Sequence, residues 1–346
     1  MIMPALIEAA ERGWIPDALI RMAIRRLLRQ RLKQDRLNAT EAGKRRFLED
    51  MRDVPLAVGT AEANQQHYEV PAEFFVSMLG PHLKYSSAWY SEPGCSLGDA
   101  ETAMLDLTMN RAEIEDGQSI LELGCGWGSL TLAMAARFVN SQITAVSNSA
   151  SQKAYIDAEA EARGLNNVSV ITRDMRSFSI DRTFDRVVSV EMFEHMRNYD
   201  ELFRRIRRWL NPEGKLFFHI FCHRNQPYFF EDQGDGDWMA RHFFTGGLMP
   251  SFDLPSRFQD ELELQDSWVV NGQHYARTCA HWLQNLDQNR APMLSALASG
   301  EHPDAPLRQW QRWRMFVMAC EALFAHEGGE AWFVGHFLMS PRSSAA

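Results

Sequence analysis

Three ionisable side chains lie close together in the segment 190–196, where Glu191, Glu194 and His195 follow an apolar run. Carboxylates and imidazoles are the groups that enzymes use most often to move protons near neutral pH. Beside a reacting group, such a side chain can accept a proton and stabilise a positive charge that develops during the reaction. The alternative for Glu194 and His195 is helix capping and core packing. Their position at the end of a predicted strand favours the catalytic role.

A group of glycines follows another apolar run. Residues 119–128 read Ser-Ile-Leu-Glu-Leu-Gly-Cys-Gly-Trp-Gly, and the following segment, 129–138, has a helical composition. Glycine lets a backbone turn tightly against a ligand, and a helix N-terminus favours an anionic or polar ligand. Ordinary turns also use glycine, so the loop alone does not name the ligand. A dinucleotide site needs an acidic residue at the end of the second strand, whereas Asn148 stands there, which argues against a dehydrogenase.

A parallel sheet is the element that would bring these two groups together. Strands separated by helices indicate an α/β fold with right-handed crossovers, and ligands of such folds bind beyond the carboxyl ends of the strands. We predict strands at 120–123, 142–146, 168–172, 184–190 and 215–221, helices at 151–163, 200–210, 275–289 and 307–325, and a final strand, 331–339, at the sheet edge.

Two segments stand apart from this alternation. Residues 1–60 are predicted to form a helical N-terminal extension to a main domain of residues 61–346, and residues 223–274 an aromatic lid over the strand ends. The extension contains a helix at 15–33 with Arg25, Arg26 and Arg29 on one face. Its other face is apolar and is formed by Leu19, Ala23, Leu27, Ile20, Ile24 and Leu28. Such a helix can lie on an anionic membrane or pack on the main domain or a second subunit, and packing is favoured.

The composition indicates a soluble protein. Of 346 residues, 45% are apolar and 23% charged, and the net charge of −9 argues against nucleic acid as a partner. The five cysteines are scattered and lack metal-ligand spacing, which favours reduced thiols, a cytoplasmic location and no metal site. No segment has the pattern of a signal peptide or of a membrane span.

Three motifs together resemble a known superfamily. Leu-Glu-Leu-Gly-Cys-Gly-Trp-Gly, Ala-Val-Ser-Asn-Ser-Ala-Ser-Gln and Val-Glu-Met-Phe-Glu-His-Met are similar to segments of the class I S-adenosylmethionine-dependent methyltransferases. More narrowly, they resemble the cyclopropane fatty acid synthase superfamily and, within it, the coclaurine N-methyltransferase-like proteins. The resemblance covers residues 64–339. It implies a Rossmann-like sheet with helices on both faces, S-adenosylmethionine as methyl donor and S-adenosylhomocysteine as product.

The resemblance also implies roles for individual residues. Those expected to contact the cofactor are Tyr85, Ser86, Gly124, Cys125, Gly126, Asn148, Gln152, Asp174, Met175 and Val190. The family's catalytic segment corresponds to Glu191, Glu194 and His195. Residues expected near the substrate are His219 and Tyr275, from the resemblance, and Trp238 and Phe244, from the aromatic lid.

The methyl acceptor stays open at this point. Lipid-modifying members hold bicarbonate with a cysteine, a glutamate, a histidine and a tyrosine; Glu194, His219 and Tyr275 match, but Ser87 replaces the cysteine. The plant N-methyltransferases have glutamate in place of His219. A buried strand histidine without a role in binding is an almost equally good interpretation of His219. We predict an N-methyltransferase of small apolar or aromatic amines, as a monomer or homodimer. The alternative is an enzyme that modifies unsaturated acyl chains at a membrane surface. A cofactor-binding protein without activity is disfavoured by the intact Glu191, Glu194 and His195.

Overall fold

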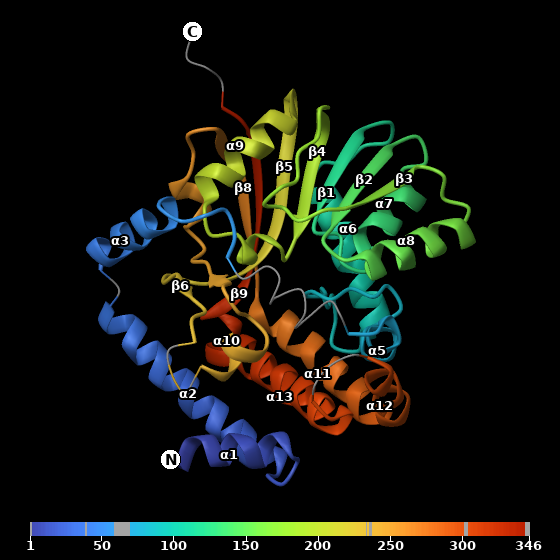
Figure 1. The fold of residues 1–346 in the computed structure, drawn as a ribbon. Helices are drawn as coiled ribbons and strands as arrows, with labels where there is room; N and C mark the ends of the chain where they lie inside the picture. The colour runs from blue at the N-terminus through green and yellow to red at the C-terminus, as the bar shows by residue number, and fades with distance from the viewer. Residues whose placement is uncertain are drawn as a thin grey trace.

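A mixed seven-stranded sheet organises the molecule (Figure 1). The computed structural model describes residues 2–38, 40–58, 70–232, 234, 237–300 and 304–342. Strands lie in the order β3-β2-β1-β4-β5-β9-β8, with β1 to β5 parallel and β9 antiparallel to both of its neighbours. Their bounds are β1 Ser119–Leu123, β2 Gln142–Ser147, β3 Val168–Thr172, β4 Phe184–Val190, β5 Leu210–His223, β8 Leu262–Val270 and β9 Trp332–Pro341. The predicted α/β class is confirmed.

The prediction that the final strand forms the sheet edge is wrong. Strand β9 lies between β5 and β8, and β8 forms the edge. The sequence does not identify β8 as a strand, because Gln265 and Asp266 face water and the strand pairing shifts between Leu264 and Asp266. A bulge of this kind breaks the alternation of apolar and polar residues by which a strand is recognised.

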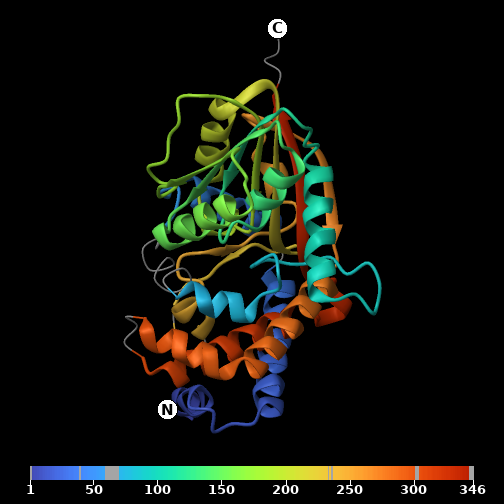
Figure 2. The same ribbon diagram turned by 90° about the vertical axis from the view of Figure 1, so that its right-hand side faces the viewer.

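Helices cover both faces of the sheet (Figure 2). They are α6 Leu97–Arg111, α7 Ser129–Arg137, α8 Ala150–Ala162 and α9 Tyr199–Trp209. Side chains of α6 and α7 pack against Ile120 and Val188, whereas those of α9 pack against Leu121 and Val187. Because successive strand residues point to opposite faces, each strand contributes to two separate cores. The carboxyl ends of β1 to β5 are left free of these helices.

A second group of helices lies beyond those carboxyl ends (Figure 1). It consists of α5 Ala72–Met78, α11 Gly272–Gln288, α12 Arg290–Ser299 and α13 Pro306–Phe324. Buried aromatic rings from three of these helices, among them Phe75, Trp282 and Trp313, meet in one core. Between the sheet and this core run α10 Trp238–His242 and a small hairpin of β6 Tyr228–Phe229 and β7 Leu248–Met249, with short 3₁₀ turns η1 Phe193–His195, η2 Pro255–Arg257 and η3 His326–Gly329.

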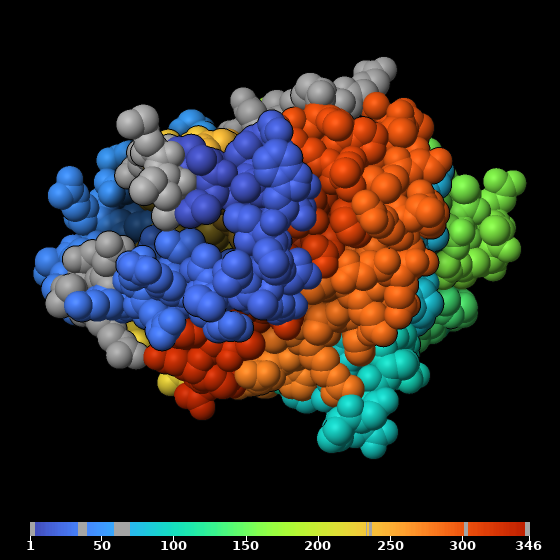
Figure 3. Space-filling view, turned by 90° about the horizontal axis from the view of Figure 1, so that it is seen from below, coloured from blue at the N-terminus to red at the C-terminus, as the bar shows by residue number. Residues whose placement is uncertain are grey.

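Two of the three N-terminal helices lie against the C-terminal helix α13 (Figure 3). They are α1 Ile2–Glu11 and α2 Asp17–Asn38, whereas α3 Glu41–Arg52 contacts α9. The packing interpretation of the basic helix agrees with the position of Ile20, Ile24 and Leu28 in the helical core. The expected continuous apolar face is wrong in part, since Leu19 and Leu27 are 52% and 47% exposed. The boundary predicted between residues 60 and 61 lies outside the described residues. Among the described helices, none is long and apolar enough to cross a membrane.

Candidate active site

The loop after β1 has a backbone that only glycine adopts easily. Gly124 has a φ of +79°, and a Cβ atom there would lie 2.7 Å from Cγ of Met192. Gly128, with a φ of +80°, precedes the first residue of α7 and lies against Ile156 in the same way. Both features need a residue without a side chain. The loop therefore exposes its backbone at the end of β1, next to the N-terminus of α7.

A cavity opens in front of this loop, at the carboxyl ends of β1, β2 and β4. The ten residues predicted to contact the cofactor all line it: Tyr85, Ser86, Gly124, Cys125, Gly126, Asn148, Gln152, Asp174, Met175 and Val190. Within the described residues, four lining side chains each have a buried polar atom without a hydrogen-bond partner: Thr108 Oγ1, Trp127 Nε1, Ser129 Oγ and Gln152 Nε2. Buried polar atoms are rarely left unpaired, so this cavity suits a polar ligand.

A second cavity lies between the sheet and the helical core. Its walls are mostly aromatic and sulfur-containing: Phe221, Phe230, Met239, Phe244, Met249, Tyr275, Cys279, Trp282, Phe316, Cys320 and Phe324. Phe244 and Tyr275 were predicted near the substrate and are among them. Burial raises the pKa of Cys320 to about 12, so this thiol stays protonated and unreactive. A flat apolar molecule fits such walls.

The two cavities meet at three side chains. Among the described residues, Tyr85, Glu191 and His195 alone line both. Glu191 directly follows β4 and has a left-handed conformation, with a φ of +49°, which is uncommon for a residue with a side chain. Backbone strain of this kind is often found at functional sites. Here it accompanies a carboxylate located at the junction of a polar cavity and an aromatic one.

The Glu191 carboxylate accepts three hydrogen bonds. The backbone N–H of Ser87 lies 3.1 Å from Oε1, His219 Nε2 lies 3.1 Å from the same oxygen, and the Tyr275 hydroxyl lies 2.6 Å from Oε2. Burial raises the pKa of Glu191, while the bond from Tyr275 and the nearby charge of Lys84 oppose that rise. Burial has the larger effect, and the pKa of Glu191 is about 7, above that of an exposed carboxylate.

The other two members of the predicted catalytic segment differ in position. His195 is at the junction, its ring stacked on Phe244 with centroids 5.3 Å apart, and burial lowers its pKa to about 4. Glu194 lines neither cavity; it is fully buried, and its Oε1 accepts the backbone N–H of Phe221 at 2.7 Å. Burial, with the charge of Glu191, raises the pKa of Glu194 well above its ordinary value, so this carboxyl group holds a proton more strongly than an exposed one.

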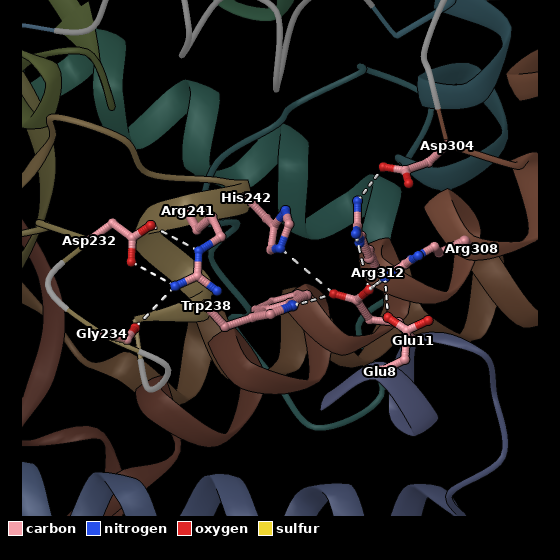
Figure 4. Close-up of polar contacts among 10 residues, drawn as sticks. All are labelled: Glu8, Glu11, Asp232, Gly234, Trp238, Arg241, His242, Asp304, Arg308 and Arg312. Carbon is pink, nitrogen blue, oxygen red and sulfur yellow. Dashed lines mark hydrogen bonds and ion pairs between the residues drawn. The ribbon is translucent and has the colours of Figure 1, made fainter. Parts of the chain in front are cut away.

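The remaining residues predicted near the substrate lie outside the aromatic cavity. His219 is fully buried behind Glu191, between that carboxylate and His336. Trp238 points toward the N-terminal helix, where its indole N–H donates to Glu11 Oε1 at 2.8 Å (Figure 4). The aromatic lid thus places Phe244 in the cavity, whereas Trp238 fastens α10 to α1.

Sequence reasoning missed two charged groups of the polar cavity. Lys84 is buried, donates a hydrogen bond to Ser86, and has its pKa lowered to about 8 by burial. Glu122 accepts a hydrogen bond from Thr131 at 2.5 Å, and burial raises its pKa to about 8. A single lysine or glutamate in a sequence does not reveal whether its side chain lies in a cavity or in water.

The strand order, the glycine loop and the cavity at the strand ends define a class I S-adenosylmethionine-dependent methyltransferase. The chain belongs to the mycolic acid cyclopropane synthetase family, whose model matches residues 58–332. The polar cavity fits the cofactor, because buried donors without a hydrogen-bond partner, such as Gln152 Nε2 and Trp127 Nε1, line it and can bond to the cofactor's polar groups.

Plant enzymes are among its most similar relatives. The chain is 35% identical to (S)-coclaurine N-methyltransferase of Thalictrum flavum subsp. glaucum, over 99% of this chain and 96% of that protein. It is 33% identical to (S)-coclaurine N-methyltransferase of Papaver somniferum, over 97% of this chain and 98% of that one. The crystal structure of coclaurine N-methyltransferase bound to N-methylheliamine and S-adenosylhomocysteine superposes with a TM-score of 0.92, at 35% identity, over 98% of this chain and 100% of that chain.

Proposed function

We propose that this protein transfers a methyl group from S-adenosylmethionine to the nitrogen of a small aromatic amine. The observation that carries the proposal is the junction at Glu191, where an aromatic cavity meets the cofactor cavity at a carboxylate. Aromatic rings and a carboxylate together favour a flat, positively charged ligand. The similarity to an N-methyltransferase crystallised with N-methylheliamine supports the same class of acceptor.

In this proposal Glu191 is the general base. A protonated amine has no lone pair to offer, so its proton must leave before nitrogen can attack the methyl group. S-adenosylmethionine supplies that methyl group on a positively charged sulfur. A buried carboxylate with a raised pKa accepts the ammonium proton more readily than an exposed one. His195 is mainly neutral near pH 7 and, stacked on Phe244, helps to orient the amine between the two cavities.

The position of Glu191 also argues against the lipid-modifying alternative. That alternative needs bicarbonate held by a set of groups that includes Ser87, His219 and Tyr275 in this chain. Ser87 N–H, His219 Nε2 and the Tyr275 hydroxyl all bond to the Glu191 carboxylate. An internal carboxylate thus occupies the donors that a bound bicarbonate would need.

A product analysis tests the proposal. The purified protein is incubated with S-adenosylmethionine and one of two kinds of acceptor. One arm contains heliamine, coclaurine and simple benzylic amines, and the other contains vesicles of unsaturated phospholipid. Mass spectrometry identifies the products. We expect amines that gain one methyl group and unchanged lipid. Lipid that carries a new methylene group, or cofactor binding without product in either arm, would overturn the proposal.

The Glu191→Gln variant tests the role of the base. Glutamine keeps the size of the side chain but accepts no proton, so kcat should fall by a factor of about 10²–10⁴. The variant should still form the same methylated amine. The matched control is Glu194→Gln on the same segment. Its amide oxygen can still accept the Phe221 N–H, so we expect kcat within a few-fold of the unmodified enzyme. Equal losses in both variants would contradict the assignment.

A further inference from the structure

A line of three side chains, two of them fully buried, leads away from Glu191. His219 on β5 faces its register partner His336 on β9, and Nδ1 of His219 lies 3.0 Å from Nε2 of His336. On the far side, Nδ1 of His336 lies 2.9 Å from Nη1 of Arg111, the last residue of α6. Both histidines are fully buried. The line therefore runs along one face of the sheet, from the junction of the two cavities to the end of α6.

The chemistry of arginine sets the direction of every bond in this line. A guanidinium has five N–H donors and no acceptor, so His336 Nδ1 must accept and its proton must be on Nε2. His336 Nε2 then donates to His219 Nδ1, whose own proton must be on Nε2. His219 Nε2 finally donates to Glu191 Oε1. Because Arg111 cannot take up a proton, the line orders donors and does not conduct protons.

We propose that Arg111 and His336 are positioning residues, which fix His219 as an Nε2–H donor and thereby keep the Glu191 carboxylate ionised and in place. The inference rests on the proposed role of Glu191 as general base. In the other tautomer, His219 would present a lone pair to Oε1, and Glu191 would have to be protonated to bond with it. Neither Arg111 nor His336 lines a cavity, so both act on the site only through His219.

Other charged and titratable groups also face Glu191. Lys84 comes from the segment before the sheet, Tyr275 from α11, Cys320 from α13, and His195 and Glu194 from the turn after β4. Their contributions stay when the line is broken, so loss of the His219 donor removes one of three hydrogen bonds to the carboxylate. A hydrogen bond to the ionised form lowers a pKa, and its loss should raise that of Glu191 by about one unit.

Nitrogen NMR of the histidine rings tests the direction of the line without any amine. The full-length protein is labelled with ¹⁵N-histidine, and the two rings are assigned from the His219→Gln and His336→Gln spectra. We expect both rings at pH 7 to carry their proton on Nε2, and Arg111→Met to change the His336 signals and, through them, those of His219. A proton on His219 Nδ1, or His219 and His336 signals unaffected by Arg111→Met, would overturn the proposal.

The pH dependence of kcat/KM tests its consequence for the reaction. In Arg111→Met and His336→Phe the acid limb should move up by about one pH unit, a loss of about tenfold below the midpoint, while Arg111→Lys keeps a donor and retains part of the effect. Arg137→Met, which alters an exposed arginine paired with Asp106, is the matched control and should keep the original profile. An unchanged pH profile in both Arg111→Met and His336→Phe would overturn the proposal. Failure to methylate any amine contradicts the proposed function. The NMR result then still tests the direction of the hydrogen bonds between Arg111 and Glu191.

Discussion

The conformation of Glu191 is the residue-scale feature on which the site depends. Its φ of +49° turns the chain sharply after β4, and its backbone N–H still bonds to His219 O at 2.8 Å. Left-handed backbone costs a residue with a side chain about 1–3 kcal/mol unless its surroundings hold it. Three donors to the carboxylate supply such surroundings. The same bonds that orient the side chain therefore also stabilise the strained backbone.

Gly124 provides a test of the cofactor loop. In Gly124→Ala the new Cβ would lie 2.7 Å from Met192 Cγ, in a backbone with a φ of +79°. We expect affinity for S-adenosylhomocysteine to fall by at least tenfold, measured by isothermal titration calorimetry. Gly94→Ala is the control, because a Cβ there meets no atom within 4 Å and affinity should not change. Equal affinities in the two variants would contradict a tight glycine loop.

The sequence predicted the cofactor side of the site better than the substrate side. Backbone turns with glycine, and residues directly after strands, have positions that topology alone determines. Glu194 and His195 are adjacent in sequence, yet the 3₁₀ turn η1 sends one into the core and the other to the junction. Trp238 depends on where α10 settles against α1. Contacts of this kind form between distant segments, so spacing in the sequence does not reveal them.

At the scale of elements, Glu11 links three helices. It is 2% exposed and accepts hydrogen bonds from Trp238 of α10 and from Arg308 and Arg312 of α13 (Figure 4). Those bonds lower its pKa to about 2 although burial opposes them. Since α10 and α13 both contribute to the aromatic cavity, the N-terminal extension helps to hold the walls of that cavity.

Replacing Glu11 with glutamine should destabilise the protein by about 2 kcal/mol at pH 7, because Arg308 and Arg312 lose a charged partner. Denaturation in urea measures the difference. A carboxylate with a lowered pKa contributes stability that is complete above pH 4.5 and is lost as the pH falls toward 2. The difference between the two proteins should therefore shrink with acidification over that range.

A neighbouring carboxylate serves as control for this prediction. Glu8 lies one turn earlier on α1, its side chain is 38% exposed, and it pairs with Arg12 and Arg308. Exposed ion pairs contribute little, so Glu8→Gln should change the free energy of unfolding by less than about 1 kcal/mol. A Glu11→Gln difference that stays constant between pH 5 and pH 3 would show that charge is not its cause.

For the molecule as a whole, the sequence predicted the parallel half of the sheet and missed its edge. Strands β1 to β5 read as apolar runs because helices bury both of their faces. Strand β8 has only one strand neighbour and carries polar residues on its exposed side. The role of residues 223–274 as a lid remains a prediction, although β8 joins part of that segment to the main sheet. The homodimer also remains a prediction.

Ligand binding should stabilise the whole molecule, because the cofactor cavity exists only in the folded state. S-adenosylhomocysteine at about 100 times its Kd should add about 2.7 kcal/mol to the free energy of unfolding. Differential scanning calorimetry should show a rise of several degrees in Tm, and Gly124→Ala, with affinity at least tenfold lower, should cut the gain to about 1.4 kcal/mol or less at the same concentration. An equal rise with ATP, added as control, would indicate a less selective cavity.

The narrow contact between the two cavities also has a use in inhibitor design. Among the described residues, only Tyr85, Glu191 and His195 line both the aromatic cavity and the cofactor cavity. A single molecule that joins an adenosyl group to an aromatic amine by a short linker could fill both at once. Because the two groups are linked, only one molecule loses its translational and rotational entropy when both cavities are filled. A bisubstrate compound of this design should compete with both substrates and report, by its best linker length, the distance that the methyl group travels.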